Sequence, residues 1–372
     1  MRLSDGYRHE REKKTRVMAD NIKKLPHVTV AVMNFNGRNV IEGTLRSILN
    51  SDYSSDVEVI VVDDCSTDDG VEYIRKEFPN VKVFIQPRNM GLNAARNRAI
   101  AEASHDFILL SDNDMELERD CLRLLVEALV DDPSAGIATP MILDFENRDQ
   151  IYSDNVELHY LCHGIIPLRH KKIPENMNWS TRRMAVGSGG MLLVRKSIIA
   201  PLNGLDESYR FGYDEGEFAL RATTRGIGVL YVPRAKIFHI ETAGRQKNRL
   251  RYAVGNRWML IFTIYSTKTI VLLAPALLLF ELAQLAYLTL KLALAEWFIG
   301  VGAVIKNLPD IMLKRRAVME SKIVPDTCLM KSGDIFMFPY RVGGGIMLTI
   351  KSVVEAVFNT YWAVVRPLIA KK

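Results

Sequence analysis

Four short apolar runs in the first third of the chain constrain the fold more than any other feature. They cover residues 28–33, 57–64, 81–86 and 106–112. Runs of this length that are apolar throughout are typical of strands buried on both faces of a sheet. Stretches of helical character follow them, at residues 39–50, 69–78, 92–104 and 117–130. This alternation predicts an α/β fold, in which a mostly parallel sheet carries helices on both faces.

Polar side chains stand where these strands are expected to end. Asn34 and Asn36 follow the first run, Asp63 closes the second, and Asp112 and Asp114 close the fourth. Ligands of parallel sheets bind beyond the carboxyl ends of the strands, so these side chains are candidates for a binding site.

The spacing of Asp112 and Asp114 suits a metal ion. Two carboxylates at this distance in the chain can hold Mg²⁺ or Mn²⁺, hard cations that prefer oxygen ligands and bridge to phosphates. The alternative is a helix cap, a position at which Asp is also favoured.

Composition excludes several other classes of protein. The 372 residues are 48% apolar and 25% charged, which argues against a disordered chain, a collagen-like fibre or a polytopic membrane protein. A net charge of +6 is too weak to indicate a nucleic-acid partner. The four cysteines form no CxxC pair, which favours a reducing, cytosolic setting. Residues 1–27 are basic and lack the apolar segment of a signal peptide, so we interpret them as an arm that is solvated or lies on a membrane surface.

The C-terminal region, residues 246–372, has a different character. Residues 258–305 are dominated by Leu, Ala, Ile, Val and Phe, and basic residues flank them on both sides. Because one helix over 270–305 would be ~54 Å long, well beyond a hydrocarbon core of ~30 Å, a helical hairpin, a re-entrant segment or helices in the membrane plane fit better than one clean span. A buried pair of soluble helices is the alternative. Residues 345–370 predict an amphipathic helix, suited either to a membrane interface or to packing on the protein's own core.

Five motifs follow one another in the order found in a known family. They read VAVMNFNG (30–37), VVDDCSTDDG (61–70), NMGLNAARNRAI (89–100), LLSDND (109–114) and GYDEGEFALR (212–221). Together they resemble the family 2 glycosyltransferases with the GT-A (Rossmann-like) fold, and more narrowly the rhamnosyltransferase-like branch. The resemblance covers about residues 28–245, which we take as the catalytic domain.

The resemblance implies roles for the residues that bind the donor, a nucleotide-diphosphate sugar linked to UDP, dTDP or GDP. Asn34 and Asn36 would cradle the nucleoside, Asp63 would read the base, and Arg96 would lie near the diphosphate. Asp112 and Asp114 would be the metal-binding pair for Mg²⁺ or Mn²⁺, with Asp112 also close to the donor.

The resemblance also implies a general base at the start of a helix. By position this base is Glu215, although the family usually has Asp there, so Asp214 remains a rival. His239 follows the last expected strand, where it would complete the metal site or simply pack. An inverting transfer needs this layout, because a base must deprotonate the acceptor hydroxyl on one side while a metal neutralises the departing diphosphate on the other.

The sequence thus predicts a glycosyltransferase that acts on a lipid-linked or growing glycan at the cytoplasmic face of the cell membrane, held there by its C-terminal region. The alternative from another class is a non-catalytic membrane-associated scaffold that binds glycan or nucleotide. A sugar nucleotidyltransferase would show a Gly-rich phosphate loop after the first strand, where this chain has NFNG. A zinc site at His159, Cys162, His163 and His170 fits no common zinc module, so we favour a loop that faces the acceptor.

Overall fold

A computed structural model describes residues 25–187, 189–241, 249–335 and 345–371. Residues 1–24, most of the expected basic arm, lie outside the described residues. The expected domain boundary at 245/246 lies outside them as well.

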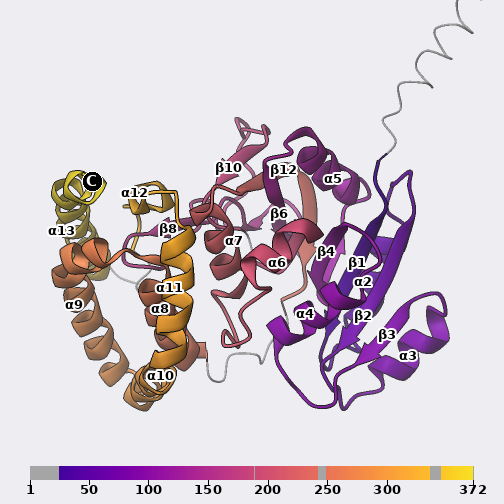
Figure 1. The fold of residues 1–372 in the computed structure, drawn as a ribbon, viewed down its shortest axis with the longest axis horizontal. Helices are drawn as coiled ribbons and strands as arrows, with labels where there is room; N and C mark the ends of the chain where they lie inside the picture. Colours follow the sequence, from indigo (N-terminus) through magenta and orange to yellow (C-terminus); the bar gives the residue numbers. More distant parts are fainter. Residues whose placement is uncertain (1–24, 188, 242–248, 336–344, 372) are drawn as a thin grey trace, which may run out of the picture.

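A mixed β-sheet forms the centre of the first part of the chain (Figure 1). Its strands run in the order β10-β12-β6-β11-β4-β1-β2-β3, with β5 paired to β12 and β7 paired to β6. Their bounds are β1 (Val28–Asn34), β2 (Val57–Asp63), β3 (Lys82–Ile85), β4 (Phe107–Asp112), β5 (Met115–Leu117), β6 (Ala135–Asp144), β7 (Ile151–Ser153), β10 (Arg182–Met184), β11 (Met191–Arg195) and β12 (Gly228–His239).

Helices cover both faces of this sheet, as predicted. They are α2 (Ile41–Leu49), α3 (Gly70–Glu77), α4 (Leu92–Glu102), α5 (Cys121–Asp131), the short η1 (Lys196–Ile198), α6 (Ile199–Leu202) and α7 (Asp214–Thr224). Alternate residues of β1 enter different cores: Val30 and Val32 pack with α2 and α5, whereas Ala31 and Met33 pack with α4 and α7. This is why the strand is apolar throughout.

The parallel arrangement expected from the sequence holds for β3, β2, β1 and β4. The second half of the sheet adds β11, which runs antiparallel to both β4 and β6, and β12, which runs parallel to β6. Strand β6 was not expected, and helix α5 begins at Cys121 rather than 117 because residues 115–117 form β5.

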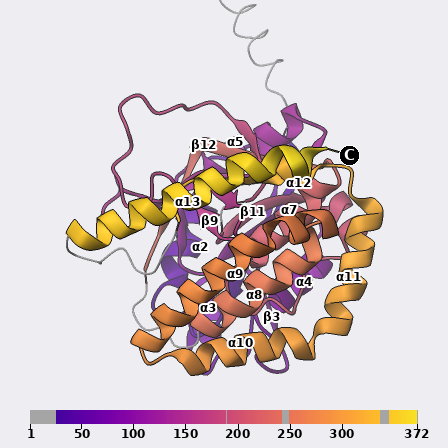
Figure 2. The same cartoon turned by 90° about the vertical axis from the view of Figure 1, so that its left-hand side faces the viewer.

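The C-terminal part is helical and packs against one end of the α/β part (Figures 1 and 2). Its elements are α8 (Arg249–Ile264), α9 (Thr267–Leu290), α10 (Leu294–Lys306), α11 (Leu308–Ser321), α12 (Asp326–Leu329) and α13 (Gly345–Ala370). A small sheet joins the two parts through β13 (Met330–Lys331), β8 (Glu157–His159) and β9 (Gly164–Ile165).

The apolar stretch at 270–305 is broken into two helices, α9 and α10. Leu292 lies in the turn between them with a φ of +55°. Among the described residues, α9 is the one helix long and apolar enough to cross a membrane by length and composition. Its inner face nevertheless packs against other parts of the protein. Leu277 and Phe280 belong to the same hydrophobic core as Leu161 of the α/β part and Trp362 of α13.

Candidate active site

Adjacent strands bring three of the predicted site residues to one edge of the sheet. Asn34 at the end of β1 stands opposite Asp63 at the end of β2, and Met33 stands opposite Asp112 at the end of β4. Because the three strands are parallel and neighbouring, residues far apart in the chain meet here.

Asn34 and Asp63 form a buried hydrogen-bonded corner, each only 1% exposed. The amide of Asn34 donates to Asp63 Oδ1 at 2.7 Å and accepts from Asn113 Nδ2 at 2.8 Å. The backbone N–H of Ser66 donates to Asp63 Oδ2 at 2.8 Å. These bonds fix the orientation of the Asp63 carboxylate. Asn36, by contrast, is exposed, with a φ of +48° and its side-chain oxygen bonded to the Thr67 N–H at 2.8 Å.

Gly37 leaves room for this corner. A Cβ atom at this position would lie 1.9 Å from Asn113 Nδ2 and 2.3 Å from Asn34 Oδ1. No side chain fits without displacing the Asn34–Asn113 pair, which explains the glycine at the end of the NFNG motif.

Arg96 joins two acidic segments of the chain. It is 1% exposed, and its guanidinium donates to Asp214 Oδ2 at 2.8 Å, to Asp112 Oδ1 at 3.1 Å and to Glu215 Oε1. The structure therefore places Arg96, predicted as a donor ligand, at the centre of three carboxylates.

The charges of this cluster do not balance. One guanidinium faces three carboxylates, so full ionisation would leave an excess of negative charge in a buried place. Burial raises the pKa of Asp214 well above its ordinary value, and the neighbouring Glu215 raises it further. Burial also acts to raise the pKa of Glu215, but Arg96, a hydrogen bond from Asp214 and the Gly190 N–H lower it to about 2. Glu215 is thus ionised at neutral pH, while Asp214 retains its proton more readily.

The acidic end of α7 has backbone support. Asp214 and Glu215 occupy the first turn of this helix, where the unpaired N–H groups favour negative charge. Gly190 donates its N–H to Glu215 Oε1 at 3.0 Å. Gly190 has a φ of +89°, a backbone conformation that favours glycine. A Cβ there would also displace the end of the Met115 side chain, whose Cε lies 2.3 Å from that position.

Asp114 and His239 face one another on the other side of the site. Asp114 Oδ2 lies 3.8 Å from His239 Nε2, and the imidazole also packs on Tyr152 at 4.3 Å between ring centroids. In the described part of the chain, no three His, Cys, Asp or Glu side chains gather into a group that could hold a metal alone. The donor set of Asp112, Asp114 and His239 still fits Mg²⁺ or Mn²⁺ when phosphate oxygens complete the shell, the usual arrangement for such ions on nucleotide substrates.

A cavity of about 560 Å³ brings the two acidic groups together. Asp112, Asp114 and His239 line it, as do Asp214 and Glu215. Asn34, Asn36, Asp63 and Arg96 are not among its lining residues. The predicted catalytic and metal-binding residues therefore share one cavity, and the predicted nucleoside residues form a separate corner beside it.

Part of the lining of this cavity was not expected from the sequence. Arg257 and Leu260 of α8, Phe280 and Gln284 of α9, and His163 contribute to it. His163 stacks on His159, with ring centroids 4.3 Å apart, and burial lowers the pKa of both. In the sequence, only the cluster of histidines near residue 160 indicated that this part of the chain could contribute to the site.

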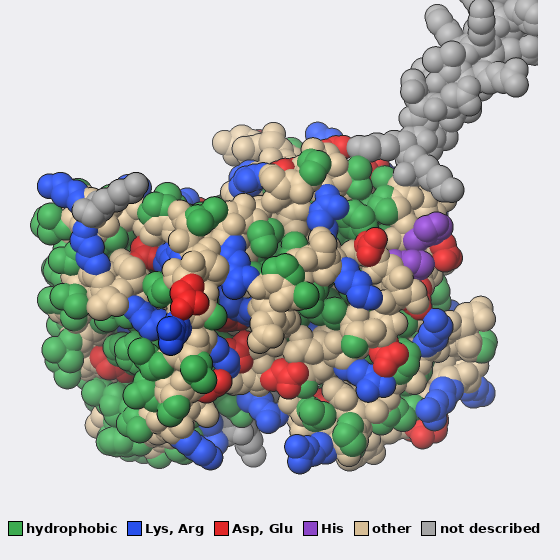
Figure 3. Space-filling model, in the orientation of Figure 1, with side chains coloured by type: hydrophobic (Ala, Val, Ile, Leu, Met, Phe, Trp, Pro, Cys, Tyr) green, Lys and Arg blue, Asp and Glu red, His purple; other side chains and the backbone are tan. Residues whose placement is uncertain are grey.

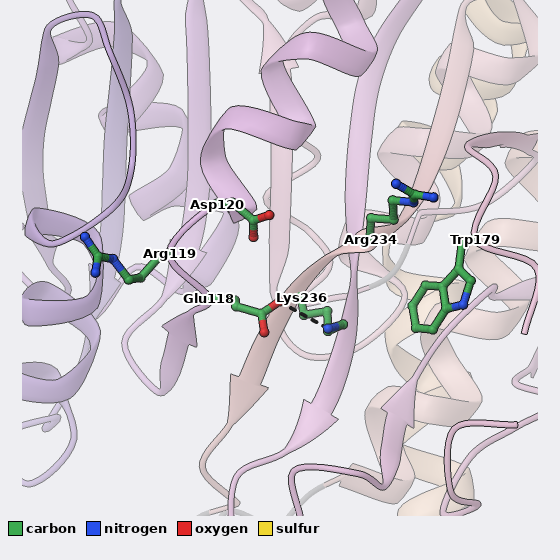
Figure 4. A pocket seen from close by; sticks show the side chains of 6 residues that line it. All are labelled: Glu118, Arg119, Asp120, Trp179, Arg234 and Lys236. Carbon is green, nitrogen blue, oxygen red and sulfur yellow. Dashed lines mark ion pairs between the residues drawn. The ribbon is translucent and has the colours of Figure 1, made fainter. Parts of the chain in front are cut away.

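A second cavity, of about 650 Å³, holds none of the predicted site residues (Figure 4). An ion pair between Glu118 and Lys236 at 3.3 Å crosses it, and Trp179 and Arg234 stand on its other side.

A family model and two curated proteins show what the chain is similar to. Residues 29–202 match the model of the family described as "Glycosyl transferase family 2". The "Probable glycosyltransferase YdaM" of Bacillus subtilis is 26% identical over 271 residues, which are 70% of this chain and 62% of that protein. The "N-acetylglucosaminyl-diphospho-decaprenol L-rhamnosyltransferase" of Mycobacterium tuberculosis is 25% identical over 205 residues, 49% of this chain and 66% of that one.

The chain spans about six tenths of the length of the first of these relatives. Among solved structures, "Crystal structure of GalNAc-T7 with UDP, GalNAc and Mn2+" matches with a TM-score of 0.54 and 18% identity, covering 65% of this chain and 48% of that one. This likeness confirms the α/β fold. The first of these relatives is named as a glycosyltransferase and the second as a rhamnosyltransferase.

Proposed function

We propose that the chain is an inverting glycosyltransferase assisted by Mg²⁺ or Mn²⁺, because residues 29–202 match the model of glycosyl transferase family 2. It transfers one sugar from a nucleotide-diphosphate donor to a hydroxyl of a lipid-linked or growing glycan. The observation that carries this proposal is the shared cavity, with Asp112, Asp114 and His239 at one place and Asp214 and Glu215 at another.

In this mechanism Glu215 is the general base. It removes the proton from the acceptor hydroxyl as the acceptor oxygen bonds to the anomeric carbon and the bond from that carbon to the diphosphate breaks. The low pKa of Glu215 keeps it ionised. Its second oxygen, Oε2, faces Gly189, where a Cβ atom would lie 3.5 Å away.

Asp214 serves as a positioning residue. With its pKa raised by burial, it holds a proton that it shares with Glu215, and it anchors Arg96 at 2.8 Å. On these pKa directions we propose Glu215 rather than Asp214 as the base.

Asp112, Asp114 and His239 would hold the divalent ion, which neutralises charge on the departing diphosphate. Asn34, Asn36 and Asp63 would bind the nucleoside of a UDP-, dTDP- or GDP-linked donor. The relative from M. tuberculosis is named for a diphospho-decaprenol-linked sugar, which supports an acceptor attached to a lipid.

We further propose that the helical region lies in the plane of the membrane, at its cytoplasmic face. Apolar side chains gather along the edge of the molecule formed by α9 and α13, the left-hand edge in Figure 3. The exposed ones on α9, α10 and α13 are Val271, Leu278, Leu279, Leu282, Leu290, Phe298, Ile299, Ile305, Val353, Val357, Val364 and Leu368. The inner face of α9 packs on the α/β part. If the helix lies in the plane of the membrane, its exposed apolar face contacts lipid while its inner face stays packed on protein.

The test is a donor screen of the full chain. UDP-, dTDP- and GDP-sugars are supplied with Mn²⁺ or Mg²⁺ and an acceptor glycan, and transfer is followed by mass spectrometry. Glu215→Gln should lower kcat by roughly 10²–10⁴-fold with the donor still bound. Glu127→Gln, at a half-exposed ion pair within α5, should leave kcat unchanged. A fully active Glu215→Gln variant would remove Glu215 from the mechanism.

A further inference from the structure

The cavity that contains the proposed catalytic carboxylates is also lined by polar groups that the proposed reaction does not use. Arg257, His163 and Gln284 all line the cavity, and each has one buried polar atom without a hydrogen-bond partner in the described chain. Such atoms are uncommon in folded proteins and costly to leave unpaired, so a cluster of three in one cavity calls for a ligand.

Arg257 is the cation of this cluster. It is 1% exposed; its Nε donates to the Leu161 carbonyl at 2.9 Å and its Nη1 to Glu281 at 2.7 Å. Nη2 has no partner. Glu281 also accepts hydrogen bonds from Trp258 and Trp297, so its charge is widely shared. These hydrogen bonds fix the position of the Arg257 guanidinium and leave its Nη2 able to donate a hydrogen bond to a ligand.

His163 and Gln284 lie beside Arg257 and supply acceptors. Phe280 connects the three: its ring centroid is 4.7 Å from the Arg257 guanidinium and 6.0 Å from the His163 ring, and Gln284 is one turn further along α9. The Nδ1 of His163 faces the Gly164 carbonyl at 3.4 Å, which leaves Nε2 as an acceptor in the neutral tautomer. Oε1 of Gln284 is the other unpaired acceptor.

A ligand that matches this set must accept a hydrogen bond from a cation and donate hydrogen bonds to neutral acceptors. A glycosyl phosphate does both, because its phosphate oxygens pair with a guanidinium and its sugar hydroxyls donate. A hydrocarbon would satisfy none of these atoms, and an anion without hydroxyl groups would satisfy Arg257 alone.

The positions of Phe280 and Gln284 on α9 indicate where a lipid chain esterified to the phosphate of such a ligand would lie. Phe280 and Gln284 lie four residues apart on the inner face, and Leu278 and Leu282 lie four apart on the exposed face. The same helix thus lines the cavity and carries the surface proposed to meet the membrane.

We propose that Arg257, His163 and Gln284 form an acceptor subsite for the glycosyl phosphate group of a lipid-linked acceptor. The proposal rests on the proposed function and narrows its acceptor to phosphate-linked glycans. It assigns the phosphate to Arg257 Nη2 and sugar hydroxyls to His163 and Gln284.

Binding without turnover tests the subsite independently of catalysis. The full chain is titrated calorimetrically in EDTA, which suppresses metal-dependent phosphate binding, with glucose 1-phosphate, octyl phosphate, inorganic phosphate and glucose. Glucose 1-phosphate should bind at least about tenfold more tightly than inorganic phosphate or glucose. If octyl phosphate binds most tightly of the four probes, the subsite binds a lipid phosphate without a sugar. This result would overturn the glycosyl part of the proposal. Equal binding of all four probes, or none, would overturn the subsite.

Two variants locate the binding. Arg257→Lys keeps the charge opposite Glu281 but lacks the second guanidinium nitrogen, so it should weaken glucose 1-phosphate about tenfold or more. Gln284 is half buried, so Gln284→Leu should disturb folding less than a substitution of the fully buried Arg257. This variant should abolish the preference for glucose 1-phosphate over inorganic phosphate. Unchanged affinities in both folded variants would contradict the assignment.

Transfer assays separate this proposal from the proposed function. With a phosphate-linked acceptor, Arg257→Lys should raise the KM for the acceptor and leave kcat nearly unchanged. With a neutral alkyl glycoside as the acceptor, the substitution should change neither KM nor kcat. If the chain transfers sugar normally but Arg257→Lys raises KM equally for both acceptors, the subsite fails and the proposed function stands. If the chain binds glucose 1-phosphate through Arg257 but transfers no sugar, the proposed function fails instead.

Discussion

Arg96 lies 2.8 Å from Asp214, although 118 residues separate them in the chain. The same guanidinium also reaches Asp112, so it connects the end of strand β4 with the start of helix α7. These two segments carry the proposed metal ligands and the proposed base. Their spacing within the site is therefore fixed by one buried cation.

Arg96→Met should destabilise the fold by about 3–5 kcal/mol, because it leaves three carboxylates around an apolar side chain. Urea unfolding measures the loss. The loss should be smaller at pH 5 than at pH 8, since protonation relieves the repulsion between the carboxylates.

Arg98→Met is the matched control two residues further along the same helix. Arg98 is half exposed, pairs with Glu102 within α4 and lies 5.8 Å from the centroid of the Phe84 ring, so its loss should cost less than about 1 kcal/mol. Equal effects of the two variants would show that the buried cluster has no special role in stability.

Gly37→Ala should abolish binding of the donor nucleotide with only a modest loss of stability, about 1–3 kcal/mol. The added methyl group would displace the Asn34–Asn113 pair that orients Asp63. Thermal shift with UDP, dTDP or GDP measures the loss. Gly302→Ala, at a glycine of α10 with no atom within 4 Å of the new Cβ, is the control that should bind nucleotide normally.

The sequence predicted those parts of the fold and site that depend on local signals. Strands β1 to β4 were found because each is a short apolar run, and Asn34, Asp63 and Asp112 were found because each closes such a run. Parallel pairing of neighbouring strands then brings these residues together without further information.

The rest depends on contacts between distant segments. Strand β6 is placed by pairing with β11 and β12, and Pro140 within it weakens its local signal. Arg96 could be noticed as a basic residue on a helix, but its three carboxylate partners come from β4 and α7. Arg257 reaches the site only because α8 packs against it, which no local pattern indicates.

Asp114→Asn should remove the metal dependence of donor binding. In the wild type, Mn²⁺ or Mg²⁺ should raise the melting temperature with the correct nucleotide, because the ligands bind only the native state. The variant should lose this increase, and EDTA should have the same effect on the wild type. Asp149→Asn, at an exposed ion pair with Lys172, should retain it. A metal response that survives in Asp114→Asn would exclude Asp114 as a ligand.

Acid should destabilise the protein through His159 and His163. Burial lowers the pKa of His163 to about 4 and that of His159 to about 2, below the ordinary value of 6.5. The unfolded state therefore takes up protons first as the pH falls, so this stabilisation is complete above pH 6.5. It is lost from there down to about pH 4 for His163 and to about pH 2 for His159. Each group should contribute roughly 1 kcal/mol per pH unit in this range.

His163→Phe should flatten this pH dependence by about half. Unfolding in urea between pH 7 and 4.5 measures the slope. His105→Gln, at a more exposed histidine, should leave the slope as in the wild type. If His163→Phe and the wild type have the same slope, the buried imidazole pair does not govern acid stability.

Leu278→Glu together with Leu282→Glu should release the full chain from membranes. Both leucines are more than half exposed on α9, at 62% and 54%, and each apolar side chain taken out of a bilayer interface costs roughly 1.5–3 kcal/mol. Flotation with vesicles of phosphatidylcholine and one quarter phosphatidylglycerol measures the bound fraction. The pair Leu49→Glu and Ile85→Glu, exposed to 51% and 52% on the α/β part, should float like the wild type. If the α9 variant floats normally but changes from dimer to monomer, α9 is an interface between copies of the chain and the membrane proposal is wrong.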